Sequence, residues 1–140
     1  VAINANRATY EVQFGALERP THTNTSWDAA KFEVCAHKYC DFAEYDYGVA
    51  MMNDCKYGHD IHDGVMRLTL LKSATYPNEA ADRCLHEFTY SIAPHTGDYR
   101  AAGIVQMAYD LNNPMTAIPV PAQAGSLPAS YSLVTVSAPT

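Results

Sequence analysis

The chain has 140 residues, the size of one ordinary domain, which can bury a hydrophobic core without disulfide staples. Fifteen acidic against nine basic side chains give a net charge of -6 without a basic cluster, which argues against a nucleic-acid or anionic-membrane binder. Only 17% of the residues are charged and 48% are hydrophobic, so we expect a folded chain rather than a disordered one.

The chain shows no pattern typical of a membrane span or a targeting signal. Its apolar runs are far shorter than the ~20 residues needed to cross a bilayer. The first residues lack the basic, apolar and small-residue order of a signal peptide. We therefore expect a soluble, cytoplasmic protein.

Four cysteines occur, and no two of them form a C-x-x-C pair. Their neighbours are apolar or strand-like, and disulfides are rare in a reducing cytosol. We expect buried free thiols at Cys35, Cys40, Cys55 and Cys84.

Strand-like segments recur along the first half of the chain. Residues 7–14 alternate between apolar and polar side chains, as in a half-buried strand. Residues 19–28 are rich in Pro, Thr, Asn and Ser and predict a loop, after which residues 31–39 alternate again.

A hairpin is predicted in the middle of the chain. Residues 47–52 and 65–71 are short apolar runs on either side of a polar stretch. Asp63-Gly64 favours the positive φ of a tight turn, so Ile61 and Val65 should lie on neighbouring antiparallel strands.

The remaining elements are a strand, a helix and an extension. Residues 87–93 predict a further strand, and residues 98–111 have the spacing of one short helix, which Gly103 weakens. Residues 116–140 form a Pro-, Ala- and Ser-rich extension that ends in a last strand at 131–137. We predict one all-β domain over residues 1–140, an antiparallel β-sandwich with at most one short helix.

Histidines and aspartates are concentrated between residues 58 and 64, a composition that could supply a metal site. On a strand, however, His59 and His62 point to opposite faces, so we favour a solvated hairpin end and expect no metal ligands in this chain. The other histidines accompany no recognisable nucleophile motif and are expected to be structural: His22, His37, His86 and His95.

Carboxylates cluster at Asp41, Glu44 and Asp46, but clustering along the chain does not establish the convergence that glycoside chemistry needs. We interpret them as a polar loop rather than as an acid/base pair.

A second polar segment, NDCKYG at residues 53–58, lies between two apolar strands, where a sandwich presents a connecting loop. Its amide, carboxylate and phenol groups could hydrogen-bond and stack on a sugar. The alternative is a polar turn closed by Gly58.

Five long segments of the chain form specific motifs. They are ERPTHTNTSWDAAKFEVCAHKY (18–39), DFAEYDYGVAMMNDCKYG (41–58), VMRLTLLKSATYP (65–77), HEFTYSIAPHTGDY (86–99) and AYDLNNPM (108–115). Together they closely resemble the C-terminal region of family-38 α-mannosidases, in the branch with cytosolic, vacuolar and bacterial enzymes.

The resemblance implies an exo-acting α-mannosidase that removes terminal α-linked mannose from glycans with retention. In this family the nucleophile, the acid/base carboxylate and the ligands of a divalent metal, zinc or similar, lie in an N-terminal α/β domain. No catalytic residue is carried over onto this chain, which is too short for the whole enzyme. We expect it to be the C-terminal portion, inactive by itself.

The β domains of this family pack against the catalytic domain and help to close the sugar site. By that similarity, four residues of the 53–58 loop become the candidates for substrate binding at the rim of the site. They are Asn53, Asp54, Lys56 and Tyr57. Lys56 could steady a carboxylate, and Asp54 could bind hydroxyl groups.

The expected partners are the chain's own N-terminal catalytic domain and mannose-containing glycans, with no nucleic acid and no membrane. Two alternatives stay open. One is a carbohydrate-binding module, which would need an exposed aromatic platform. The other is an interdomain or homo-oligomerisation module, in which a Tyr-rich face is the interface.

Overall fold

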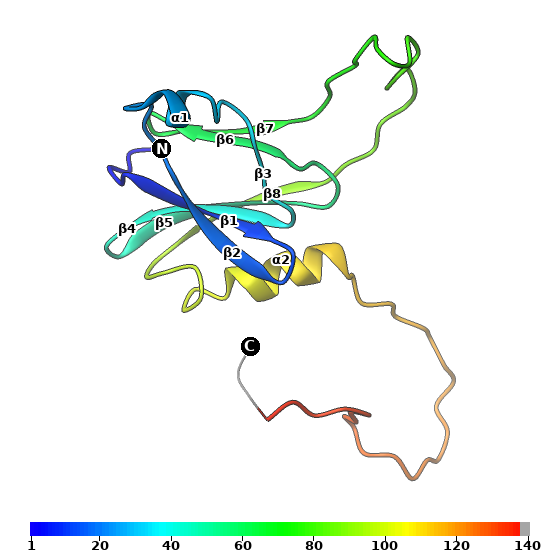
Figure 1. The fold of residues 1–140 in the computed structure, drawn as a ribbon. Coiled ribbons are helices and arrows are strands. Elements are labelled where there is room, and N and C mark those ends of the chain that lie inside the picture. The colour runs from blue at the N-terminus through cyan, green and yellow to red at the C-terminus, as the bar shows by residue number, and fades with distance from the viewer. Residues whose placement is uncertain (138–140) are drawn as a thin grey trace.

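The structure is a computed structural model that describes residues 1–137, in which two antiparallel sheets lie face to face (Figure 1). The larger sheet has the order β2-β1-β4-β5-β8. Its strands are β1 (Arg7–Val12), β2 (Gly15–Pro20), β4 (Tyr39–Glu44), β5 (Tyr47–Asn53) and β8 (Tyr90–His95). The smaller sheet consists of β3 (Val34–Cys35), β6 (Gly58–His62) and β7 (Val65–Thr69), in the order β3-β6-β7. The predicted antiparallel β-sandwich is confirmed.

One helix longer than a single turn, α2 (Ile104–Asn112), occurs in residues 1–137 and covers the outer face of the larger sheet (Figure 1). The other helix, α1 (Ser26–Ala29), is one turn, which Thr25 and Asp28 close with a capping box. The sequence predicts a helix from residue 98, but Gly103 has a φ of 72° at the N-cap and delays its start to Ile104.

The main core lies between the two sheets. Phe42 and Val49 of the larger sheet pack in one cluster with Ile61 of β6, and all three side chains are buried. Burying each such side chain contributes roughly 1.5–3 kcal/mol. A second cluster on the other face joins Met52 to Ile104 of α2, so both faces of β4 and β5 are covered.

This double coverage explains why β4 departs from the prediction. The first four residues of β4 are all buried, so the strand does not show the alternation of a half-exposed one. The polar-loop interpretation is therefore wrong for Asp41 and Glu44, which lie in β4, while Asp46 lies in a turn.

The predicted hairpin at Asp63-Gly64 is confirmed. Their φ values are 52° and 72°, the left-handed conformation of a two-residue hairpin turn. Across it, His62 pairs with Val65, which places Ile61 and Val65 on neighbouring antiparallel strands.

The edges of the sheets were harder to predict. The expected strand at 31–39 forms only the two-residue β3, followed by the first residue of β4. The predicted loop at 19–28 begins two residues late, because the edge strand β2 extends to Pro20. Residues of β2 are mostly exposed, so this strand depends on pairing with β1 and shows no burial pattern.

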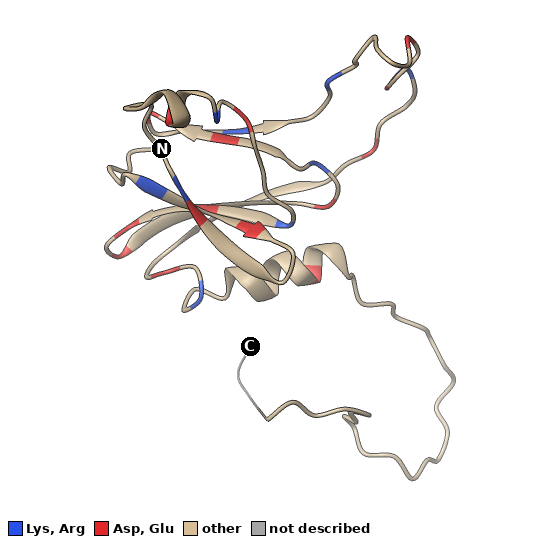
Figure 2. Cartoon of the chain, viewed as in Figure 1, with Lys and Arg blue, Asp and Glu red and all other residues tan. Residues whose placement is uncertain are grey.

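The last strand predicted at 131–137 is not formed, since residues 113–137 contain neither helix nor strand. They run as an extended, exposed segment without charged side chains (Figure 2). Residues 138–140 of the expected extension lie outside the described part. The single-domain division of the chain stays a prediction.

Charged side chains are spread over both sheets, and the Lys and Arg positions in residues 1–137 are scattered singly (Figure 2). In the same part of the chain, no helix combines the length and apolar character needed to span a membrane.

Candidate functional site

The 53–58 loop connects the two sheets. Asn53 is the last residue of β5 in the larger sheet, and Gly58 is the first residue of β6 in the smaller one. The four candidate side chains therefore start from a short connection that is held at both ends by regular structure.

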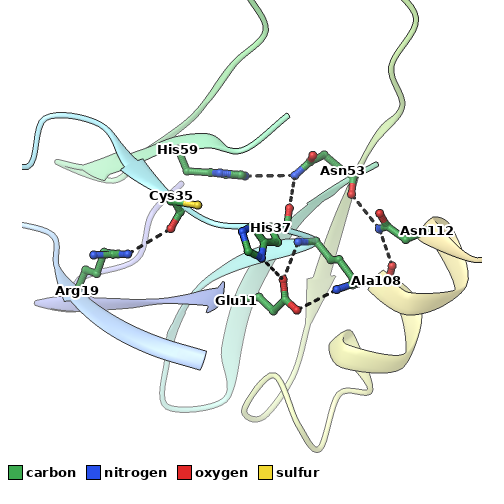
Figure 3. Close-up of polar contacts among 9 residues, drawn as sticks. Glu11, Arg19, Cys35, His37, Asn53, His59, Ala108 and Asn112 are labelled. Carbon is green, nitrogen blue, oxygen red and sulfur yellow. Dashed lines mark hydrogen bonds and ion pairs between the residues drawn. The ribbon is translucent and has the colours of Figure 1, made fainter. Parts of the chain in front are cut away.

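Asn53 is fully buried and is bonded on every side (Figure 3). Its Nδ2 donates to the His37 carbonyl at 2.9 Å, and its Oδ1 accepts from the Lys56 backbone N–H at 2.6 Å. Its own backbone N–H donates to Lys38, and its carbonyl accepts from Asn112 Nδ2 at 3.0 Å. Through these hydrogen bonds, Asn53 positions the loop from the protein interior.

Asp54 connects the loop by hydrogen bonds to the segment that leads into β8. Its Oδ1 accepts from the Thr89 backbone N–H at 2.9 Å, and its own N–H donates to the Thr89 carbonyl at 3.2 Å. The hydrogen bond from Thr89 lowers the pKa of the Asp54 carboxyl, so this side chain is ionised at neutral pH.

Among the four candidates, Lys56 is partly exposed and Tyr57 is half exposed. The Lys56 ammonium lies 5.3 Å from the Phe88 ring centroid and forms no ion pair within residues 1–137. Tyr57 is 50% exposed, and its ring meets that of His37 edge-on at 5.2 Å. The loop thus presents one cation and one partly exposed aromatic ring.

A partly buried ion pair that was not predicted from the sequence joins Glu11 of β1 to Lys38, whose carbonyl accepts from the Asn53 N–H. Glu11 is only 3% exposed, and it accepts from the Lys38 backbone N–H at 2.9 Å and from Lys38 Nζ at 3.1 Å. Strand alternation places Glu11 on the polar face of β1, where Lys38 and His37 of the segment before β4 contact it. A polar residue on an alternating strand is normally exposed, so the sequence gives no signal that Glu11 is buried.

His59 contradicts the prediction of a solvated hairpin end. It is fully buried, its Nε2 lies 3.4 Å from Asn53 Nδ2, and burial lowers its pKa, which favours the neutral imidazole. His62 lies on the other face of β6, beside Asp60. Within residues 1–137, no three His, Cys, Asp or Glu side chains are grouped to hold a metal ion.

A second buried pair joins distant strands of the larger sheet. His95 Nε2 of β8 lies 2.7 Å from Asp41 Oδ1 of β4, and the two side chains are 6% and 3% exposed. The imidazole crosses the intervening β5 above Gly48, where a Cβ would come within 2.3 Å of the ring. Burial raises the pKa of the Asp41 carboxyl, and the bond to His95 opposes that shift.

All four cysteines are free, but only Cys40 is buried, so the expectation of buried thiols fails for the other three. Burial raises the pKa of the Cys40 thiol to about 12. We expect a thiol reagent such as Ellman's reagent to titrate three thiols in the native chain and four after denaturation. Four fast-reacting thiols in the native chain would contradict the burial of Cys40.

Comparison with known proteins confirms the resemblance in the sequence. Residues 1–80 match the glycosyl hydrolases family 38 C-terminal domain. Alpha-mannosidase 2C1 of Homo sapiens is 47% identical over 98% of this chain, which corresponds to 13% of that protein. Alpha-mannosidase G of Dictyostelium discoideum is 51% identical over 79% of the chain and 10% of its own length.

Alpha-mannosidase of Saccharomyces cerevisiae is 50% identical over 80% of the chain. The chain spans only 10% to 13% of the length of these three relatives. The matched residues 1–80 of this chain include strand β1 with Glu11, strand β4 with Asp41 and the whole 53–58 loop. The chain therefore belongs to the family-38 glycosyl hydrolases, in their C-terminal domain.

Proposed function

We propose that this chain is the C-terminal domain of a retaining exo-α-mannosidase, in which it supports the catalytic domain and contributes the 53–58 loop to the rim of the sugar site. The observation that carries the rim proposal is the geometry of the loop. Lys56 is partly exposed and forms no ion pair in residues 1–137, and Tyr57 is half exposed. Asn53 and Asp54 hold the backbone of the loop beside them.

The chemistry of this loop suits a sugar. A lysine ammonium donates hydrogen bonds to hydroxyl oxygens or steadies a carboxylate of the catalytic domain, and an exposed Tyr57 offers an apolar ring face to a pyranose. The ionised Asp54 carboxylate accepts hydrogen bonds from sugar hydroxyl groups in this proposal. Asn53 acts in this proposal as a positioning residue, since its amide is already bonded to His37 and Lys56.

Catalysis itself belongs to another part of the parent enzyme in this proposal. Within residues 1–137, no three His, Cys, Asp or Glu side chains are grouped to hold a metal ion. We assign the nucleophile, the acid/base carboxylate and a divalent metal, zinc or similar, to the N-terminal catalytic domain. The 140-residue chain should therefore be inactive by itself.

The test of the rim proposal is Lys56→Ala in the full-length parent enzyme. A hydrogen bond from a charged donor contributes about 1.5–3 kcal/mol, so kcat/KM for an aryl α-mannoside should fall by about tenfold to a hundredfold. Lys31→Ala is the matched control, because Lys31 is an exposed lysine outside the loop. Unchanged kcat/KM in a folded Lys56→Ala enzyme would exclude Lys56 from the rim.

A cytoplasmic location is part of the same proposal. The four free cysteines support a reducing compartment, where unpaired thiols persist. Subcellular fractionation of the parent enzyme tests this point. Recovery in a secreted or organellar fraction would contradict it.

Two further roles remain alternatives. A homo-oligomerisation role would show as a concentration-dependent mass in sedimentation equilibrium of the parent enzyme. A carbohydrate-binding role would show as saturable binding of methyl α-mannoside by the 140-residue chain.

A further inference from the structure

A buried histidine contacts the residue that holds the 53–58 loop (Figure 3). His59 is fully buried on β6, and its Nε2 lies 3.4 Å from Nδ2 of Asn53. Its other ring nitrogen, Nδ1, has no hydrogen-bond partner of ordinary geometry within residues 1–137. The protonation state of this imidazole is therefore linked to the position of the Asn53 amide.

Two backbone groups fix the orientation of the Asn53 amide. The Lys56 N–H can only donate, so the atom 2.6 Å from it is Oδ1. The His37 carbonyl can only accept, so the atom 2.9 Å from it is Nδ2. Nδ2 therefore also faces His59, and an amide nitrogen only donates.

This orientation determines the tautomer of His59. A ring nitrogen that faces a donor must be unprotonated, so Nε2 accepts and the proton of the neutral imidazole lies on Nδ1. Burial lowers the pKa of His59, while the Tyr57 carbonyl and the Glu33 carboxylate oppose that shift. The closed loop therefore requires a neutral His59 in one tautomer.

A charge on His59 would have no close partner. Within residues 1–137, no carboxylate forms an ion pair with this imidazole. The charged and titratable groups on the surrounding elements contact other partners or solvent. They are Glu33 before β3, His37, Asp54 and Lys56 around the loop, and Asp60 paired with Arg67 on the other face of β6 and β7.

We propose that His59 is a positioning residue, which holds the 53–58 loop closed through the Asn53 amide and releases the loop when Nε2 takes up a proton. With Nε2 protonated, two donors would face each other across the 3.4 Å contact. Turning the Asn53 amide would relieve that conflict, but its NH₂ group would then face the Lys56 N–H and its oxygen the His37 carbonyl. The bonds that hold the loop are therefore lost in either case.

The direction of the pH dependence follows from the proton balance. In the open loop His59 is hydrated and has an ordinary pKa of about 6.5, whereas burial lowers its pKa in the closed loop. Closure is therefore fully favoured above about pH 6.5 and weakens as the pH falls toward the lowered pKa. The opening equilibrium should rise about threefold to tenfold between about pH 7.5 and 5.5.

The first experiment is NMR of the isotopically labelled 140-residue chain, which observes the imidazole directly. At about pH 7.5 we expect the ring correlations of a neutral His59 with its proton on Nδ1. A proton on Nε2 at this pH would overturn the inference, because Nε2 could then not accept from Asn53.

Amide hydrogen exchange measures the opening of the loop. The Lys56 N–H and the Ala36 N–H, which donates to the Tyr57 carbonyl, report on it. After correction for intrinsic exchange, their protection should fall about threefold to tenfold between about pH 7.5 and 5.5, while that of Met51 in β5 is retained. Unchanged protection in the loop, or an equal loss in β5, would overturn the inference.

His59→Gln removes the titration and keeps a side-chain oxygen that can accept from Asn53. Loop protection should then be independent of pH in this range. His37→Gln is the matched control, because the His37 ring contacts Tyr57 and only its backbone carbonyl accepts from Asn53, so the pH dependence should remain. Dependence that persists in His59→Gln or is lost in His37→Gln would overturn the assignment to His59. If His59→Gln does not fold, the tautomer and the exchange of the unchanged chain decide.

Only the effect on turnover rests on the proposed function. In the full-length parent enzyme, kcat/KM should fall with the pH profile of loop opening, and His59→Gln should remove that part of the fall. Loop opening without any such change in kcat/KM would contradict the rim proposal and leave the role of His59 intact.

Discussion

His95→Ala should destabilise the chain by about 3–5 kcal/mol at pH 7, because it leaves the Asp41 carboxylate buried without a partner. The Asp41 side chain is 3% exposed, and His95 Nε2 at 2.7 Å is its hydrogen-bond partner. Urea denaturation of the 140-residue chain measures the loss. His22→Ala is the matched control, since the His22 imidazole is partly exposed and lies 3.7 Å from Asp28, and it should cost less than about 1 kcal/mol.

The destabilisation caused by His95→Ala should increase as the pH rises from 4 toward 7. The pKa of Asp41 is raised by burial and by Asp98 and lowered by His95, so removal of His95 raises it further. A raised carboxyl pKa favours folding below its ordinary value, and that contribution is lost as the pH rises through the raised value. The deficit of His95→Ala should therefore be smallest near pH 4 and grow toward neutrality. A deficit independent of pH would contradict the explanation that His95 compensates the buried Asp41 carboxylate.

Gly48 provides a steric test of the same pair. A Cβ at this position would lie 2.3 Å from the His95 ring and 2.8 Å from the Ala43 Cβ, so Gly48→Ala must displace the imidazole. Gly15→Ala, whose Cβ would meet no atom within 4 Å, is the control and should be nearly neutral. In the His95→Ala background Gly48→Ala should cost markedly less, which a double-mutant cycle measures. Full additivity would contradict the geometry.

This pair also shows how far the sequence could predict the fold. Strands β1 and β7 were predicted close to their bounds, because β1 alternates in sequence and β7 follows a tight turn. β4 is covered on both faces, and its Asp41 is buried because His95, 54 residues later in the chain, reaches it across β5. Local periodicity contains no information about such a long-range partner.

The candidate loop shows the same limit at the level of a site. Its polar composition and its place between two apolar runs were enough to predict a connecting loop at residues 53–58. Composition could not distinguish the buried Asn53 from the half-exposed Tyr57, because burial here depends on contacts with residues 36–38 and α2. Sequence reasoning therefore found the loop and assigned its four polar residues one common role.

Asn53→Ala should separate these roles, with a loss of about 2–4 kcal/mol in the free energy of unfolding. The change leaves the Lys56 N–H and the His37 carbonyl without their partner and opens a cavity beside His59. Asn113→Ala is the matched control, because Asn113 is an exposed asparagine that donates to Tyr109 at 3.1 Å. It should cost less than about 1 kcal/mol.

A positioning role for Asn53 predicts more than lost stability. Without the 2.6 Å bond to the Lys56 N–H, residues 54–57 should exchange their amide hydrogens faster, while the strands β4 and β5 remain protected. In the full-length enzyme, Asn53→Ala should then lower kcat/KM at a temperature where the fold is intact. Adding Lys56→Ala should lower it little further, because both changes remove the same placed ammonium. Independent, additive losses of the two variants would show that Asn53 contributes to the reaction by a route other than placing Lys56.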